Sequence, residues 1–144
     1  YGPTDEVGCF DLGERGIVGL EDPSGLFLSS ERSQVPGTCA TVTLEGRRPV
    51  PVEVQALVAP TAAASPRRTT SGVDHSRVAM SLAVLAARLR LDTSNADVYV
   101  STVGGARAVE PATDLAVAIA VAGAARNLPA PPGLVAFGEV GLTG

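Results

Sequence analysis

The sequence predicts an α+β fold, with two main helices on one side of a mixed sheet of about six strands. Apolar and polar residues alternate through the first half of the chain, and apolar residues recur at helical spacing in two later stretches. A β-branched run separates those two stretches. The length of 144 residues indicates one domain. With 3% aromatic residues, the core must be aliphatic.

The strands are predicted from a side-chain period of two or from short apolar runs. They are expected at residues 6–12, 17–20, 38–44, 50–58, 98–103 and 134–137. A turn at 13–16 joins the first two strands into a hairpin. Pro49 and Pro51 place the beginning of the fourth strand at a sheet edge or where the chain joins the sheet. Residues 29–36 and 60–73 are predicted to be loops.

Two helices are predicted in the second half of the chain. The first begins after the N-cap residue Asp74, because apolar residues then recur at helical spacing from Val78 to Leu89. The second spans residues 113–126 and should be largely buried, since it has almost no polar face. Asn127 and the prolines after it end that helix.

The charged residues limit the chemistry. All 11 basic residues are arginine, so the chain has no lysine to serve as a Schiff base, a general base or a Walker A residue. The net charge of -4 and the pI of about 4.9 exclude an overall basic footprint for nucleic acid. A DNA contact therefore needs a local patch or help from another part of a larger protein.

The remaining composition points away from metals and membranes. Cys9 and Cys39 lie too far apart for a CxxC pair and, with one histidine in the chain, make no zinc site. They are expected to be reduced, buried thiols of a cytoplasmic protein. No uninterrupted run of about 18 apolar residues occurs, so nothing here is predicted to span a membrane.

Arginines in predicted turns and loops are candidate DNA contacts, because a guanidinium binds phosphate as a planar fork. The candidates are Arg47, Arg48, Arg67, Arg68 and Arg107. The alternative is ordinary solvated charge, and for Arg107 the choice is between a ring channel and solvent. Gly104-Gly105, just before Arg107, either cradles an anion or makes a tight connection to the next helix.

Other polar residues have simpler interpretations. His75 lies between Asp74 and Ser76, but consecutive helical residues point in different directions, so capping is favoured over a catalytic cluster. Glu110, Asp114 and Glu139 could pair as acid and base. Nothing in the sequence places them together, so surface or capping roles are favoured.

Several stretches resemble the C-terminal domain of the RadA (Sms) family of bacterial DNA-repair ATPases. They are residues 1–8 (YGPTDEVG), 51–58 (PVEVQALV), 66–68 (PRR), 97–100 (DVYV), 104–105 (GG), 110–116 (EPATDLA) and 137–144 (FGEVGLTG). The resemblance covers nearly the whole chain. That domain is itself similar to the proteolytic domain of Lon proteases, so a Lon-protease-like fold is implied.

The resemblance also implies a degenerate catalytic position. Lon-type peptidases carry the serine nucleophile in an Asp-Gly-Pro-Ser-Ala-Gly motif at the start of a helix. Here Pro111 matches the motif and Ala112 occupies the serine position. A methyl group cannot attack a carbonyl, and the hydroxyl of Thr113 is rotated by about 100° on a helix. No catalytic residue is therefore expected, although an active serine peptidase or a phosphate-binding module remain the alternatives.

For the longer protein, the resemblance implies a RecA-type, DNA-dependent ATPase that promotes branch migration in recombination. ATP, magnesium and an N-terminal zinc finger are implied there, but no cofactor in these residues, which contain no GxxxxGK[ST] motif. The implied partners are copies of itself in a hexameric ring, single-stranded or branched DNA, and the recombinase RecA. Residues 1–144 are expected to be one domain cut from a longer chain, with the ATPase upstream and the end of the domain downstream missing.

Overall fold

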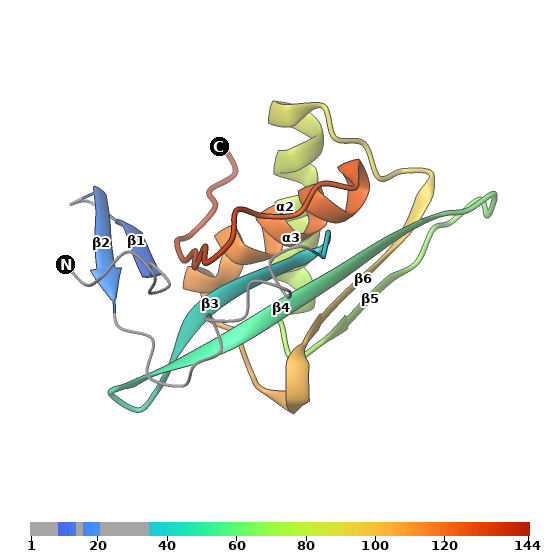
Figure 1. Ribbon diagram of the computed structural model, residues 1–144. Coiled ribbons are helices and arrows are strands. Elements are labelled where there is room, and N and C mark those ends of the chain that lie inside the picture. The colour runs from blue at the N-terminus through green and yellow to red at the C-terminus, as the bar shows by residue number, and fades with distance from the viewer. Residues whose placement is uncertain (1–8, 14–15, 21–34) are drawn as a thin grey trace.

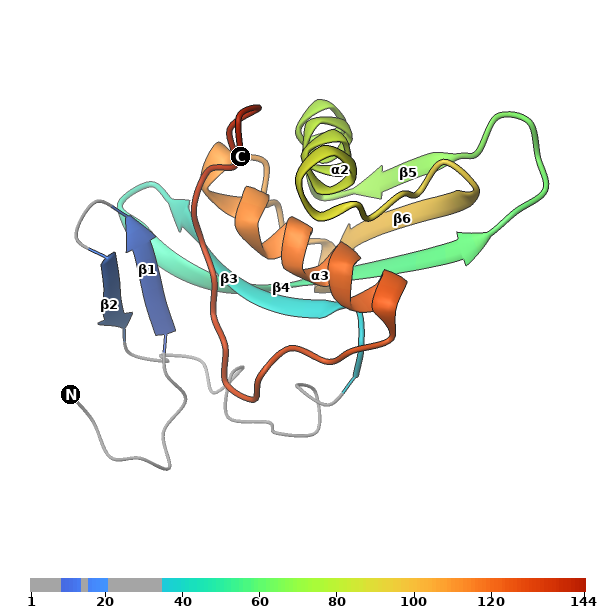
Figure 2. The same cartoon turned by 90° about the horizontal axis from the view of Figure 1, so that it is seen from above.

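Two helices lie on one face of a four-stranded sheet in the computed structural model, which describes residues 9–13, 16–20 and 35–144 (Figures 1 and 2). The strand order is β3-β4-β6-β5, antiparallel except for the parallel pair β5 and β6. The sheet strands are β3 (Thr38–Glu45), β4 (Arg48–Pro60), β5 (Arg68–Ser71) and β6 (Ala96–Thr102). The helices are α2 (His75–Leu89) and α3 (Asp114–Arg126), with short 3-10 turns η2 (Val103–Gly105) and η3 (Pro111–Thr113).

The α+β class, the mixed sheet and both main helices are confirmed, but a mixed sheet of about six strands is wrong. Among the described strands, β1 (Cys9–Gly13) and β2 (Gly16–Leu20) pair only with each other, as the predicted hairpin. Two parts of the prediction lie outside the described residues. They are residues 6–8 of the predicted first strand and residues 29–34 of the first predicted loop.

The sheet also differs from prediction at both of its edges. Strand β5 lies within residues 60–73, the segment predicted to be a loop. Its polar residues form a strand because they pair with β6. The strand predicted at 134–137 is reduced to one parallel bridge between Ala40 and Val135, with the Ala136 amide donating to the Ala40 carbonyl. The segment touches β3 at that point and then turns toward α3.

The long central strand β4 has two differently paired halves. Residues 48–55 pair with β3, whereas only residues 54–60 pair with β6. Within the described part of the chain, Pro49 and Pro51 therefore lie where β4 has a neighbouring strand on one side only. The prediction that these prolines mark an edge or the point where the chain joins the sheet is confirmed.

The core lies between the helices and the sheet and is aliphatic, as predicted. Its fully buried members include Val54, Val98, Val100, Ala116, Ala120 and Val121. Helix α3 has buried residues around most of its circumference, which its lack of a polar face predicted. Helix α2 is capped by Asp74, whose Oδ1 accepts from the amides of Ser76 (2.8 Å) and Arg77 (3.2 Å). Among the described residues, neither helix is long and apolar enough to cross a membrane.

Gly72 lets two segments approach closely just before α2. Its φ is +79°, and a Cβ there would lie 2.5 Å from the carbonyl oxygen of Ala106. The Gly72 carbonyl accepts from the Ala108 amide at 2.6 Å, and the next residue forms a bridge with Ala108. This contact holds the segment before α3 against the segment before α2.

We expect Gly72→Ala to lower the free energy of unfolding by about 2–4 kcal/mol. Two costs are combined there: the strain of a left-handed backbone at alanine, and the clash of its Cβ with the main chain. Gly104→Ala is the matched control, since its φ is +72° but a Cβ there meets nothing within 4 Å. That variant should lose only about 1–2 kcal/mol. Equilibrium urea denaturation measures both, and equal losses would contradict the close approach.

Cys39 provides a second test of the packing. Its side chain is 3% exposed on β3, and burial raises the pKa of the thiol to about 12. In a Cys9→Ser background, we expect native Cys39 to react with a thiol reagent at pH 8 roughly a thousandfold more slowly than an exposed cysteine. Rapid native labelling at pH 8 would rule out this burial.

The raised pKa of Cys39 also predicts a pH dependence of stability. The unfolded chain releases the thiol proton near pH 9 and the folded chain near pH 12, so the free energy of unfolding should fall as pH rises through that window.

Candidate functional site

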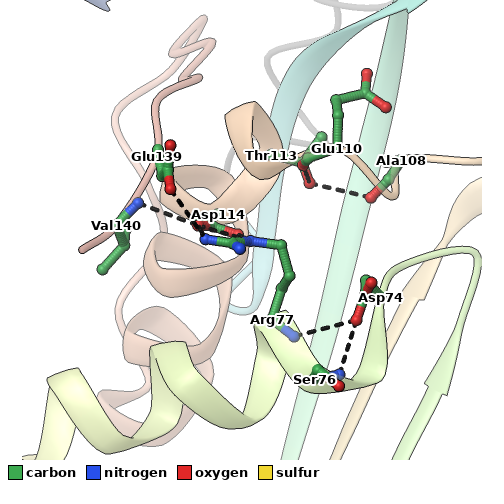
Figure 3. Close-up of polar contacts among 9 residues, drawn as sticks. All are labelled: Asp74, Ser76, Arg77, Ala108, Glu110, Thr113, Asp114, Glu139 and Val140. Atoms are coloured by element: carbon green, nitrogen blue, oxygen red, sulfur yellow. Dashed lines mark hydrogen bonds and ion pairs between the residues drawn. The ribbon is translucent and has the colours of Figure 1, made fainter. Parts of the chain in front are cut away.

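The turn just before α3 contains Ala112, the residue that the resemblance to Lon-type peptidases aligns with their serine nucleophile. The turn η3 leads directly into α3, and a returning segment near the end of the chain lies against it (Figure 3). The Gly138 amide donates to the Ala112 carbonyl at 2.7 Å, and the Gly138 carbonyl accepts from the Leu115 amide at 3.0 Å. Position 112 therefore carries a methyl group on a turn whose main chain is already bonded to another segment.

The neighbouring hydroxyl belongs to Thr113, and it faces the main chain. The side chain is 3% exposed in total, and its Oγ1 donates to the carbonyl oxygens of Glu110 (2.8 Å) and Ala108 (3.0 Å) (Figure 3). A hydroxyl in this position closes a turn. Among the described residues, both of its partners are main-chain carbonyl oxygens.

A buried ion pair lies one residue further on. Asp114, the first residue of α3, accepts two parallel hydrogen bonds from Arg77 of α2. The Nε–Oδ1 distance is 2.9 Å and the Nη2–Oδ2 distance is 2.7 Å. The side chain of Asp114 is 3% exposed and that of Arg77 is 22% exposed. This fork-to-fork geometry is the strongest form of an arginine–carboxylate contact.

The returning segment joins the same ion pair. The Val140 amide donates to Oδ2 of Asp114 at 3.1 Å, and Glu139 lies 3.5 Å from Nη2 of Arg77 (Figure 3). The pKa of Arg77 is raised, first by its hydrogen bonds to Asp114 and then by the charges of the surrounding carboxylates. Arg77 is therefore committed to its carboxylates, and the cluster is a structural junction of three segments.

The other polar candidates do not form a catalytic group. His75 is an exposed first residue of α2, while the Asp74 carboxylate caps the helix. Glu110 lies apart from the ion pair, since its Oε1 accepts from the Leu44 amide at 3.2 Å. Within the part of the chain that the structure describes, no three His, Cys, Asp or Glu side chains gather as a metal site would require.

The five candidate arginines lie in separate places. Arg47 and Arg48 are exposed at the turn between β3 and β4. The register aligns Arg68 with Val58, ten residues along β4 from Arg48, which is about 30 Å at 3.3 Å per residue. Arg107 is exposed between η2 and η3.

Arg68 differs from the other four candidates because its guanidinium is used within the fold. It donates to the carbonyl oxygens of Ala96 (2.6 Å) and Thr93 (2.9 Å) and so ties β5 to the turn before β6. Arg67 is exposed, and its amide donates to Oδ1 of Asp97 at 2.7 Å. Gly104 and Gly105 are exposed, with φ values of +72° and +76°.

Sequence reasoning did not find the pairing of Arg77 with Asp114. A signal was present, because an aspartate at the start of an otherwise apolar helix needs a partner if that helix is buried. The partner is 37 residues away in the sequence, so the packing of two helices decides which arginine it is.

The chain is similar over all 144 residues to known DNA repair proteins. It is 54% identical to "DNA repair protein RadA" of Mycobacterium tuberculosis strain H37Rv and covers 30% of that protein. It is 52% identical to the RadA of Mycolicibacterium smegmatis and 42% identical to that of Bacillus subtilis, covering 31% of each. The chain thus spans about a third of the length of the curated relatives it matches. No family model matches the chain.

We expect the two acids that contact Arg77 to differ sharply when each is changed to its amide. Asp114→Asn should lower the free energy of unfolding by about 2–3 kcal/mol, because it removes a buried charged hydrogen-bond acceptor. Glu139→Gln, at a side chain that is 63% exposed, should cost less than about 0.5 kcal/mol.

Urea denaturation gives both values, and amide hydrogen exchange at Val140 reports on the returning segment. Exchange there should accelerate in Asp114→Asn only. Similar losses in the two variants would show that the ion pair is not the junction described.

Proposed function

Because this chain belongs to the RadA family of DNA repair proteins, we propose that it is the non-proteolytic, Lon-protease-like domain of a longer DNA-repair ATPase. Its role is ring assembly and DNA contact rather than catalysis. Residues 1–144 form one domain of that longer protein, with the Lon-protease-like fold as its architecture. The four-stranded sheet under two helices supports this assignment.

The observation that carries the proposal is the start of α3. Ala112 supplies no nucleophile, and the hydroxyl of Thr113 is directed at two carbonyl oxygens. Gly138 bonds to the Ala112 carbonyl and to the Leu115 amide, so its segment occupies the main chain on both sides of Thr113. A serine peptidase needs an accessible hydroxyl beside a base, so the peptidase alternative has no support here.

The DNA contact is assigned to the exposed arginines rather than to all five candidates. Arg47, Arg48, Arg67 and Arg107 leave their guanidinium groups available at the surface, whereas Arg68 donates to main-chain carbonyls. Each of these guanidinium groups carries one positive charge and can neutralise one phosphate. With a net charge of -4, the domain should bind DNA weakly by itself and act together with the rest of the protein.

The longer protein would supply the remaining chemistry. We assign ATP, magnesium and zinc to its other parts. Its proposed partners are copies of itself in a hexameric ring, single-stranded or branched DNA, and RecA. We propose that it acts in the cytoplasm. Branch migration would be driven by the ATPase. No observation at Gly104 and Gly105 favours the alternative of a phosphate-binding module, since both are exposed and a Cβ built on either would meet no atom within 4 Å.

The test is the salt dependence of DNA binding by the full-length protein. Replacing Arg47 and Arg48 together by alanine should reduce the slope of log affinity against log salt by about 1–2, because each lost phosphate contact removes about one released counterion. Fluorescence anisotropy of labelled DNA over a salt series measures it.

The control changes the same charge elsewhere. Arg88→Ala combined with Arg90→Asn removes two exposed arginines at the end of α2, and asparagine tolerates the left-handed φ of +55° at position 90. Its slope should match that of the unchanged protein. If both double variants altered the slope equally, the β3–β4 turn would not be a specific DNA contact.

A further inference from the structure

The face of the sheet opposite the helices carries an exposed aromatic residue within an ordered set of side chains. On β4 and β6 the core side is taken by residues such as Val54, Val98 and Val100, so Leu57 and Tyr99 point to the other face. Leu57 is 59% exposed and Tyr99 is 36% exposed. Figure 2 shows both helices on the core side only.

Three strands place these side chains in one row. Leu57 is the register partner of Tyr99, and Tyr99 is the register partner of Thr69 on β5. Register partners on neighbouring strands lie about 5 Å apart and project from the same face. The row, called here the Tyr99 row, is an aromatic ring flanked by an aliphatic side chain and a hydroxyl.

A polar row runs beside the Tyr99 row. Gln55, Ser101 and Ser71 are register partners across the same three strands. The Gln55 amide nitrogen donates to Glu53 at 2.8 Å, which leaves the Gln55 carbonyl oxygen as an acceptor. The Ser101 hydroxyl donates to the Thr102 carbonyl oxygen at 3.0 Å, so its oxygen is also left as an acceptor, and the Ser71 hydroxyl completes the row.

Charge lies on the opposite side of the Tyr99 row. Asp97 precedes Tyr99 by two residues, and its Oδ1 accepts from the amide of Arg67 at 2.7 Å. Arg67 precedes Thr69 by two residues, is exposed, and continues the alternation of β5. Arg67 therefore lies on the charged side of the Tyr99 row together with Asp97, whose carboxylate is already hydrogen-bonded to the main chain. A second carboxylate, that of Glu53, lies on the other side and accepts from Gln55 of the polar row.

From this arrangement we propose that the Tyr99 row is a stacking platform for an unpaired nucleobase of single-stranded DNA. A base stacks on the Tyr99 ring against Leu57, the polar row contacts its edge, and Arg67 contacts the adjoining phosphate. An exposed aromatic on an open sheet face, with arginine and small polar groups around it, suits single-stranded nucleic acid. Two large apolar side chains are too small an area for a stable protein interface.

This inference rests on the proposed DNA contact and goes further by selecting single-stranded over branched DNA and by naming the residues that contact a base. Base stacking depends on the presence of a base, whereas an arginine–phosphate contact does not. The distinction allows the platform to be tested separately from DNA binding in general.

The experiment measures binding of the full-length protein to labelled oligothymidylate and to an abasic strand of equal length. Tyr99→Leu should weaken binding to oligothymidylate by about 5- to 150-fold, the range for loss of one stacked base. It should leave binding to the abasic strand unchanged. Tyr99→Phe should retain full affinity, because the ring remains.

Two further variants complete the design. Leu57→Ala should weaken oligothymidylate binding in the same base-dependent way but less strongly. Leu128→Ala, a truncation at a side chain that is 60% exposed beyond the end of α3, should change nothing. Irradiation with a 5-iodouracil strand should crosslink Tyr99, which peptide mapping would locate.

Several outcomes overturn the platform. Unchanged binding in Tyr99→Leu, or an equal loss with normal and abasic strands, would exclude stacking while leaving the DNA contact in place. A change in self-association without a change in DNA binding would assign this face to a second copy of the chain. Absence of DNA binding by the unchanged protein would instead refute the proposed function itself.

Discussion

The pairing of Arg77 with Asp114 is the constraint on which the rest of the structure depends. Asp114 begins a helix that is buried on most sides, and a carboxylate there is tolerated only with a charged partner. Arg77 comes from the first turn of α2, so satisfying this one charge fixes the relation between the two helices. The helices in turn fix which side of the sheet is filled.

The same carboxylate sets the position of the returning segment. Val140 bonds to Asp114, and Gly138 bonds to the main chain on either side of it. The start of α3 is thus surrounded by groups that hold it. The same few hydrogen bonds stabilise the beginning of the helix and fix the path of the returning segment.

Local patterns predicted most of the fold, while long-range pairing decided what they missed. The N-cap at Asp74 and the apolar character of α3 are local, and both were correct. Strand β5 was missed because its polar residues, 68–71, become a strand only by pairing with β6. Residues 134–137 looked like a strand but make one bridge to β3. Arg77 and Asp114 needed the packing of two helices.

The two prolines of β4 have a consequence for the behaviour of the molecule in solution. Pro49 and Pro51 lie in the half of the strand that pairs with β3 but with no other strand that the structure describes. A proline has no main-chain donor, so this stretch offers an incoming strand a poor template for edge-to-edge pairing. The sheet is thereby protected against aggregation where its longest strand would otherwise invite another chain to extend it.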